Sequence, residues 1–255
     1  MAFTGKVVLV TGAASGMGRL ASQNMARAGA KVAALDVNEE GLRATAEGYE
    51  SVRCYALDVA DARAVNERVR EVERDLGPID RVYNAAAIMP TEILLKQDID
   101  TVKRIMDINY GGVAAVCHAI MPGMLERGRG DMIIFASIAG WLPSMHFGAY
   151  NASKFAVVAY TEVLYHETRG RGVRMVCVCP PPVDTPLLAQ AKSQPKVLEQ
   201  LPPIQPQDVL DAIDAGLEKG QLFVFPGRAT KLSWRLRRFL PGLMWRNVHR
   251  VEGAP

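Results

Sequence analysis

The sequence predicts a single α/β domain in which a doubly wound parallel sheet of seven strands carries helices on both faces. Three observations support this fold. Short apolar runs alternate with longer amphipathic segments along almost the whole chain. The runs are nearly continuous hydrophobics, as in strands that are buried on both faces, and their alternation with helices implies right-handed crossovers. The 255 residues, 49% of them hydrophobic, suffice for one large core.

The predicted strands, in chain order, are 6–10, 31–35, 52–57, 80–85, 131–137, 173–179 and 221–225. The predicted helices between them are 16–28, 38–47, 61–75, 99–126, 150–169 and 207–219. The longest irregular piece, 184–206, is rich in proline, and we expect it to form a lid over a site. We therefore divide the chain into a catalytic domain, 1–227, which includes this lid, and a basic extension, 228–255.

Charge and cysteine content restrict the class of protein. The net charge of +3 is too small to indicate a nucleic-acid partner, and seven of the cations lie between Arg228 and Arg250. Cys177 and Cys179 lie two apart on a predicted strand, which suggests buried thiols in a reducing compartment. No histidine has a ligand partner at metal-site spacing, so we expect no metal. No signal peptide precedes the first strand and no apolar stretch approaches the ~20 residues of a membrane span, so we expect a cytoplasmic protein.

A glycine-rich turn follows the first predicted strand. The segment VTGAASGMG places Gly12, Gly16 and Gly18 between a strand and a helix. Glycines at the carboxyl end of a parallel strand let the backbone approach a pyrophosphate, which then sits at the helix N-terminus. A tight strand–helix connection without a ligand would use the same residues.

Asp36 ends the second predicted strand, roughly 20 residues after the glycine turn. A carboxylate there accepts hydrogen bonds from ribose hydroxyls and repels a 2′-phosphate, and no basic residue near Ser15 or Val37 would neutralise such a phosphate. The position therefore favours NAD over NADP. The alternative is a helix N-cap, although Asn38 could fill that role.

Tyr150 and Lys154 lie four residues apart at the start of a predicted helix, so their side chains share one face. A nearby ammonium favours the phenolate and should lower the tyrosine pKa from its ordinary value of about 10. Ser137 ends the preceding strand and could hydrogen-bond a substrate oxygen, and Asn109 lies in the long helical segment before that strand. A Tyr/Lys pair alone is common on plain helix surfaces, so its neighbours decide the interpretation.

With these residues in this order, the sequence resembles the short-chain dehydrogenase/reductase family over roughly residues 4–227. The resemblance implies a Rossmann fold and a nicotinamide cofactor. It implies that Ser137 orients the substrate oxygen and Tyr150 exchanges the proton. Lys154 would bind the nicotinamide ribose and tune Tyr150, and Asn109 would hold a water in the proton relay. It also implies a homodimer or homotetramer formed through helices 99–126 and 150–169.

The cofactor-binding residues that the resemblance implies are Gly12, Ser15, Gly16, Met17, Gly18, Asp36, Val37, Asp58, Val59, Asn84, Ala85, Ala86, Tyr150, Lys154, Pro180, Val183 and Thr185. Two motifs depart from the family pattern. In the segment usually written Asn-Asn-Ala-Gly, Ala85 lacks an amide that usually braces the central strand, and Ala87 narrows the space beside the nicotinamide. In the segment Pro-Gly-x-Val-x-Thr, Pro181 replaces the glycine, while the Val183 N–H and the Thr185 hydroxyl are retained.

Three consecutive prolines, 180–182, leave two interpretations open. They could stiffen one wall of the nicotinamide and substrate pocket, because each fixes φ and has no N–H. They could instead merely end the strand.

We therefore predict reversible hydride transfer between NAD(H) and a secondary alcohol or ketone. The expected substrate-facing residues are Ile88, Met89, Trp141, Pro143, Met145, His146, Pro182, Leu187 and Leu188. Most are apolar, which favours a lipophilic substrate such as a steroid, a terpenoid, or a long-chain or aromatic alcohol. His146 could bind a distal polar group or face solvent. The alternative function is a protein of this fold without net redox turnover, either a dehydratase or epimerase or an NAD-sensing scaffold.

The basic extension has its own pattern. If it is helical up to Leu240, an apolar stripe of Leu232, Leu236, Phe239 and Leu240 is flanked by cations, with a break at Pro241. Three hypotheses stay open: packing against the substrate pocket or a partner subunit, reversible docking on an anionic membrane, and a flexible tail without function.

Overall fold

A computed structural model describes residues 6–191, 195–196 and 202–253 of the protein. Its strands are β1 Val7–Thr11, β2 Lys31–Asp36, β3 Val52–Ala56, β4 Arg81–Asn84, β5 Gly130–Phe135, β6 Val173–Val178 and β7 Phe223–Val224. They form one parallel sheet in the order β3-β2-β1-β4-β5-β6-β7. The predicted doubly wound sheet of seven strands is confirmed. The order reverses between β1 and β4, where ligands bind at the carboxyl ends of such strands.

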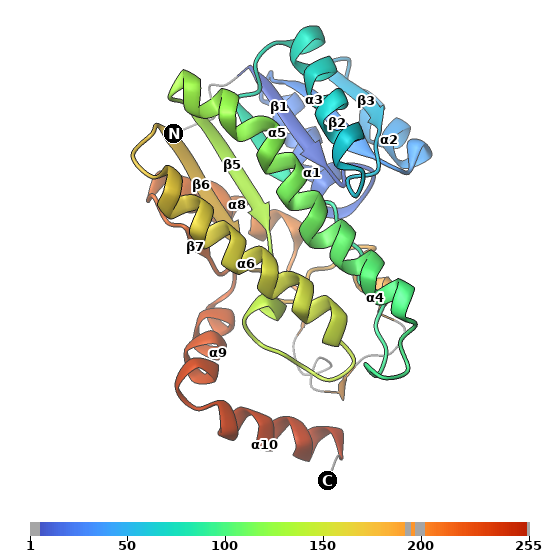
Figure 1. Ribbon diagram of the computed structural model, residues 1–255, viewed down its shortest axis with the longest axis vertical. Helices are drawn as coiled ribbons and strands as arrows, with labels where there is room; N and C mark the ends of the chain where they lie inside the picture. Colours follow the sequence, from blue (N-terminus) through green and yellow to red (C-terminus); the bar gives the residue numbers. More distant parts are fainter. Residues whose placement is uncertain (1–5, 192–194, 197–201, 254–255) are drawn as a thin grey trace.

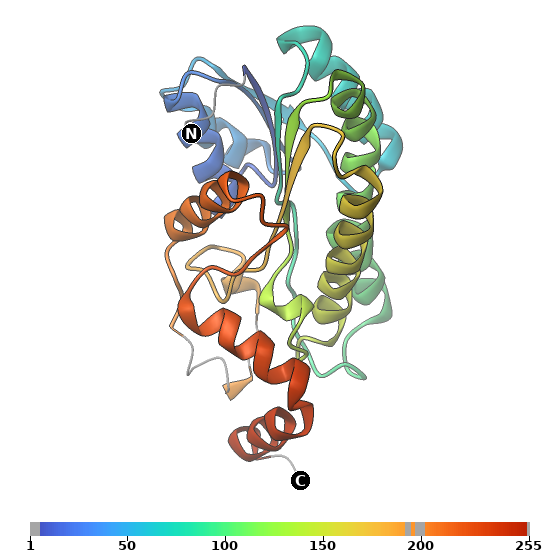
Figure 2. The same ribbon diagram turned by 90° about the vertical axis from the view of Figure 1, so that its left-hand side faces the viewer.

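Helices cover both faces of the sheet (Figures 1 and 2). One layer contains α1 Gly16–Arg27, α2 Glu39–Ala46 and α8 Pro206–Glu218; the other contains α3 Ala62–Leu76, α4 Ile99–Met106, α5 Gly112–Arg127 and α6 Gly148–Thr168. Successive strand residues point to opposite layers: Leu9 packs with the second layer, and Val8 and Val10 pack with the first. All three are fully buried, which stabilises the fold by roughly 1.5–3 kcal/mol per side chain.

The long predicted helix at 99–126 is interrupted. A π-helical turn, Asp107–Gly111, joins α4 to α5, and buried Asn109 lies within it. The whole run Ile99–Arg127 has 29 residues and an apolar window of mean hydropathy 1.2, which is enough to span a membrane by length and composition. The expectation that no stretch approaches that length is therefore wrong. Half of this window is buried, and the run packs on α3 and α6 as a core helix does.

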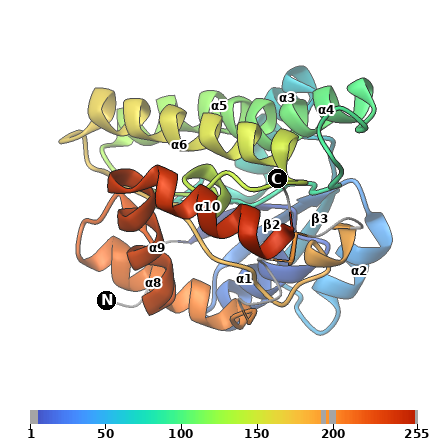
Figure 3. The same cartoon turned by 90° about the horizontal axis from the view of Figure 1, so that it is seen from below.

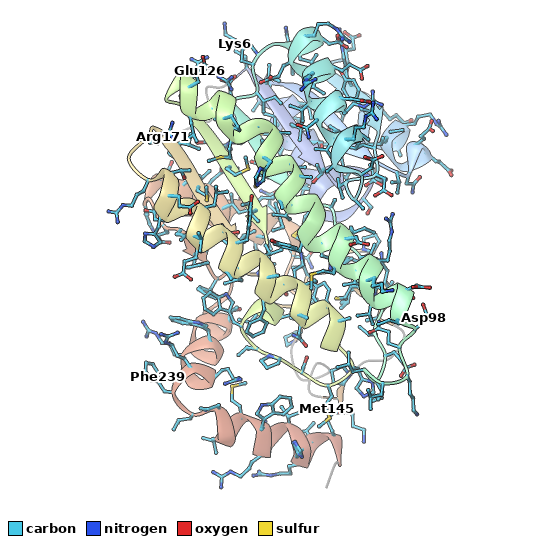
Figure 4. The ribbon with its side chains drawn as sticks, viewed as in Figure 1. Lys6, Asp98, Glu126, Met145, Arg171 and Phe239 are labelled. Atoms are coloured by element: carbon cyan, nitrogen blue, oxygen red, sulfur yellow. The ribbon has the colours of Figure 1, made fainter. Side chains whose placement is uncertain are left out.

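The amino-terminal edge of the sheet is held by a buried ion pair. The Arg81 guanidinium donates to Asp131 Oδ2 from Nε at 2.9 Å and from Nη2 at 2.8 Å, and both side chains are at most 5% exposed. Arg174 on β6 and Asp214 on α8 extend the network. Lys6, Glu126 and Arg171 mark this end of the molecule in Figure 4, and Met145 and Phe239 mark the opposite end. The carboxyl edge is therefore left for the site.

Two further helices, α9 Arg228–Phe239 and α10 Pro241–Glu252, follow β7. The predicted break at Pro241 is confirmed. The side chains of Leu232 and Leu236, half of the predicted apolar stripe, lie outside the described residues, as do parts of the predicted lid at 192–194 and 197–201. Seen toward the carboxyl ends of the strands, α10 crosses between the two helical layers (Figure 3).

Candidate active site

The turn between β1 and α1 packs backbone directly on backbone. Gly12 has φ +69°, and a Cβ on it would lie 2.9 Å from the Ala86 backbone. A Cβ on Gly18 would lie 2.1 Å from the carbonyl oxygen of Gly12. Gly16, at φ +51°, faces Thr185, whose Cβ would be 3.2 Å away. The glycines are therefore required by close approach at three strand ends, which brings this turn and the β6 loop to one place.

Asp36 supports the same turn. Its Oδ2 accepts a hydrogen bond from the Ala14 N–H at 3.1 Å, and its Oδ1 accepts one from the Asn38 N–H at 3.0 Å. Asn38 caps α2 by accepting from the Gly41 N–H, so the capping alternative for Asp36 does not hold. A carboxylate has about four acceptor positions, and Asp36 keeps some for a ligand hydroxyl.

A cavity of about 420 Å³ lies beyond Asp36, and Val37, Leu57, Asp58 and Arg68 are among the residues that line it. Val37 is 66% exposed. Asp58 forms an ion pair with Arg104 of α4. Val59, in contrast, does not line this cavity; it is 6% exposed and its side chain packs against Gly112.

The strand that Ala85 was expected to leave without a brace is braced by its neighbours. The Thr11 hydroxyl donates to Asn84 Oδ1 at 3.2 Å and accepts from the backbone N–H groups of Ala85 and Ala86 at 3.0 and 3.2 Å. The Asn84 amide in turn donates to the Val113 carbonyl. Thr11 and Asn84 therefore connect β1, β4 and α5 without an amide at position 85.

Asn109 is fully buried in the π-helical turn, and its amide is engaged. Its Oδ1 accepts from the Ile88 N–H at 2.9 Å, and its Nδ2 donates to the Ile88 carbonyl and to Ser153 Oγ, both at 3.0 Å. The side chain thereby holds the loop after β4 against α6. The role of Asn109 in a water relay stays a prediction.

Ser137 and Tyr150 are hydrogen-bonded to each other. Ser137 Oγ also accepts from the Ala139 N–H at 3.1 Å, which caps the short turn Ile138–Gly140. Tyr150 is 5% exposed, and burial raises its pKa to about 12, against the lowering effect of the hydrogen bond with Ser137. The hydroxyl therefore holds its proton at neutral pH.

Lys154 lies one turn further along α6. Its Nζ donates to the Phe135 carbonyl at 2.8 Å and lies 5.8 Å from the centre of the Tyr150 ring. Burial lowers the pKa of Lys154 to about 8, although the thiols of Cys177 and Cys179 act in the opposite direction. The expected lowering of the Tyr150 pKa is thus wrong for this arrangement, because burial of the phenol outweighs every other influence on its pKa.

Gly140 allows the turn after Ser137 to approach α6 closely. A Cβ on Gly140 would lie 2.6 Å from the Lys154 carbonyl oxygen. The turn that carries Ser137 consequently rests directly on the backbone of α6. Sequence reasoning did not single out Gly140, because only the packed structure shows this approach.

These groups open into a cavity of about 680 Å³. Predicted residues that line it are Met17, Ala85, Met89, Ser137, Pro143, Tyr150, Lys154, Pro180, Pro182, Val183, Thr185, Leu187 and Leu188. The cofactor-side and substrate-side residues are therefore brought together. All three prolines line the cavity, which supports the interpretation of a stiff wall.

Four predicted substrate-facing residues are not brought to this cavity. Trp141 packs against Phe223, Phe225 and Trp234, with ring centres 5.2–6.0 Å away, and its Nε1 donates to Cys179 Sγ. Ile88 is held through its backbone by Asn109. Met145 and His146 belong to the loop before α6 and are absent from the lining; His146 has φ +67° there.

The extension supplies lining residues that sequence reasoning missed. They are Leu243, Met244, Asn247, Val248 and Arg250, all on α10. Their spacing follows one face of a helix, a signal that is present in the sequence after Pro241. The hypothesis that the extension packs against the substrate pocket agrees with this placement.

The described residues fit a nicotinamide dinucleotide. The glycine turn leaves bare backbone at a helix N-terminus, and Asp36 presents a carboxylate at the end of β2. Within the described part of the chain, the Val183 N–H has no hydrogen-bond acceptor, although Val183 is only 6% exposed. A carboxamide would supply that acceptor.

Comparisons with known proteins agree with this site. The family model of the short chain dehydrogenases matches residues 6–196. D-threitol dehydrogenase of Mycolicibacterium smegmatis is 39% identical over 199 residues, covering 75% of each chain. The 2-(R)-hydroxypropyl-CoM dehydrogenase of Xanthobacter autotrophicus is 30% identical over 248 residues, covering 89% of this chain and 99% of that protein.

A solved structure agrees with the family match as well. The crystal structure of a short-chain dehydrogenase/reductase from Burkholderia phymatum in complex with NAD superimposes with a TM-score of 0.86 at 26% identity and covers 96% of each chain. Together with a family match over most of the sequence, this shows that the chain belongs to the short-chain dehydrogenase/reductase family.

Proposed function

We propose that the protein is an NAD(H)-dependent oxidoreductase that interconverts a secondary alcohol and a ketone. The observation that carries this proposal is the convergence of Ser137, Tyr150 and Lys154 on the cavity that Val183 and Thr185 also line. A non-catalytic scaffold would not need the buried Tyr150 hydroxyl, its partner Ser137 and the desolvated Lys154 ammonium in one place. The named dehydrogenases among the relatives support the same reaction class.

The raised pKa of Tyr150 supports a role for it as the proton donor. Bound NADH would supply the hydride to a ketone. Ser137 orients the carbonyl oxygen, and Tyr150, which carries its proton at neutral pH, donates that proton to the oxygen as negative charge develops there. The Lys154 ammonium then favours the resulting phenolate until it regains a proton. Alcohol oxidation uses the same steps in reverse.

Asp36 supports NAD as the preferred cofactor. Its carboxylate accepts two backbone N–H bonds at the end of β2, which hold it in place for ribose hydroxyls and leave its charge to repel a 2′-phosphate. The Burkholderia phymatum relative was solved with NAD.

The lining of the cavity supports a lipophilic substrate. Beyond Ser137 and Tyr150, the walls are mostly aliphatic side chains, prolines and Phe147. A polyol, as in the name of the relative from Mycolicibacterium smegmatis, would leave most of its hydroxyls without partners there. A steroid, a terpenoid, or a long-chain or aromatic alcohol would bury apolar surface instead.

The bend between α9 and α10 supports peripheral contact with an anionic membrane. Phe239, which Figure 4 labels, and Leu240 are 75% and 50% exposed at this bend. Arg238, next to Phe239 in the chain, and Arg246 on α10 are exposed as well. Apolar side chains among cations are typical of interfacial segments. Assembly into a dimer or tetramer and a cytoplasmic location stay predictions; exposed Phe155 and Val163 on α6 offer apolar surface for assembly.

Replacing Tyr150 by Phe tests the proton step. The variant keeps the ring and loses the hydroxyl, so turnover with NAD and a substrate should fall at least about 10²-fold. Cofactor binding, measured by calorimetry, should survive. Near-normal turnover by a folded Tyr150→Phe protein would remove Tyr150 from the mechanism.

Replacing Lys154 by Met tests the burial of the ammonium. The Lys154 pKa is about 8 in the folded protein and 10.5 ordinarily. Between these pH values the unfolded chain binds more protons, so the free energy of unfolding of the parent should rise relative to that of Lys154→Met, by on the order of 3 kcal/mol in all. Denaturant unfolding of both proteins at several pH values measures the difference. A difference that does not change with pH would contradict the burial.

Replacing Asp36 by Ala tests cofactor choice. The parent should have a higher kcat/KM with NAD than with NADP, and Asp36→Ala should erode that preference, mainly by weakening the use of NAD. Asn38→Ala is the matched control. It removes the side chain that caps α2, two residues away, and leaves the Asp36 carboxylate in place. Equal use of both cofactors by the parent would show that Asp36 only supports the turn.

Replacing Phe239 by Ser tests membrane contact. The parent should co-sediment with phosphatidylserine-containing vesicles at low salt and less at high salt, because salt screens the cations. Phe239→Ser should bind less at either salt concentration. A chain truncated after Gly227 serves as the control. Binding that ignores lipid charge, or that persists without the extension, excludes this contact.

A further inference from the structure

The inner face of α10 is mixed in character. Leu243, Met244 and Val248 give it an apolar surface toward the cavity, and Val248 is 7% exposed. Asn247 and Arg250 lie on the same face, and both are exposed to solvent while they line the cavity. They therefore stand at its opening. Their helix, α10, crosses between the two helical layers (Figure 3).

The described charged residues that line this cavity are both cations. Lys154 and Arg250 are the charged residues among its described lining, and neither Asp nor Glu contributes to it. Lys154 is 2% exposed and donates to the Phe135 carbonyl beneath Tyr150. Arg250 stands at the opening, so the two cations occupy different parts of the cavity.

Arg250 has no ion pair with any residue in the described part of the chain. The nearest acid in sequence, Glu252, is two positions away and so points to another side of the helix. An arginine is charged at every physiological pH and presents a planar fork of donors that matches a carboxylate. Arg250 thus lines a cavity to which no acid among the described residues contributes.

We propose that Arg250, assisted by the Asn247 amide, binds an anionic group at the distal end of the substrate. The substrate class is then a hydroxy or oxo acid: a secondary alcohol or ketone at Tyr150, an apolar chain along the walls, and a carboxylate or related oxyanion at α10. This inference rests on the proposed redox function and narrows its lipophilic substrate to an amphipathic anion.

The test compares substrates that differ only in charge. The probes are (ω−1)-oxo acids of six to twelve carbons and the corresponding oxo amides, reduced with NADH. The parent should use the acid of best length with a kcat/KM about tenfold or more above that of its amide, the scale of a charge-assisted hydrogen bond. Arg250→Met should remove this preference, mainly by raising KM for the acid.

Arg246→Met is the matched control. Arg246 lies on the same helix, is exposed and is absent from the cavity lining, so its removal takes the same charge from the extension without touching the substrate. It should leave the acid preference intact. Equal use of acids and amides by the parent, or an equal loss in Arg246→Met and Arg250→Met, overturns the proposal.

Binding without turnover separates this proposal from the redox function. Calorimetry with octanoate and octanamide should show tighter binding of octanoate to the parent and to Arg246→Met but not to Arg250→Met. If no oxo acid is reduced and octanoate binding still depends on Arg250, the anion site stands and the redox function fails. If octanoate and octanamide bind alike to the parent, the anion site is overturned whatever the turnover.

Discussion

The burial of the Lys154 ammonium is the constraint on which the site depends. A cation that is 2% exposed is tolerated because the Phe135 carbonyl at the end of β5 accepts a hydrogen bond from it. That contact fixes where α6 lies on the sheet, and Gly140 lets the turn after Ser137 rest on the same stretch of α6. The positions of Ser137, Tyr150 and Lys154 are thus coupled through backbone contacts, and a shift of one displaces all three.

The convergence of the candidate site residues could be predicted from sequence because the signals for them are local. Tyr150 and Lys154 lie one helical turn apart, and Gly12 and Asp36 follow strands that are visible as apolar runs. The boundaries were less predictable. The strand expected at 131–137 ends at Phe135, because Ser137 caps the next turn instead of pairing.

Loop side chains could not be placed from sequence, since their direction is set by distant partners. Trp141 was expected to face the substrate, yet it packs against Phe223 and Trp234, which lie far along the chain. The π-helical turn at Asn109 has the same origin, because its amide bonds to Ile88 and Ser153, which no helical periodicity reveals. Burial of Tyr150, which reverses the expected direction of its pKa shift, also belongs to the packed structure alone.

The three prolines after β6 place no backbone N–H group against the apolar cavity. A wall of ordinary residues would present backbone N–H groups to the apolar part of the cavity, where they would lack acceptors, each at a cost of about 1–3 kcal/mol. Prolines present none, and the carbonyls of Pro180 and Pro182 accept from the backbone of Ile138 and Ile204. The first backbone N–H after the prolines is that of Val183. This is the donor for which we propose the cofactor carboxamide as acceptor.

The groups proposed for proton transfer and those proposed for substrate selection lie in parts of the fold that tolerate substitution differently. Substitutions around Lys154 and Gly140 disturb a packed core, where losses of several kcal/mol are usual. Asn247 and Arg250 are exposed on a helix outside the sheet, where substitutions usually change stability by less than about 0.5 kcal/mol. Substitutions at Asn247 and Arg250 are therefore expected to leave the packing around Lys154 intact.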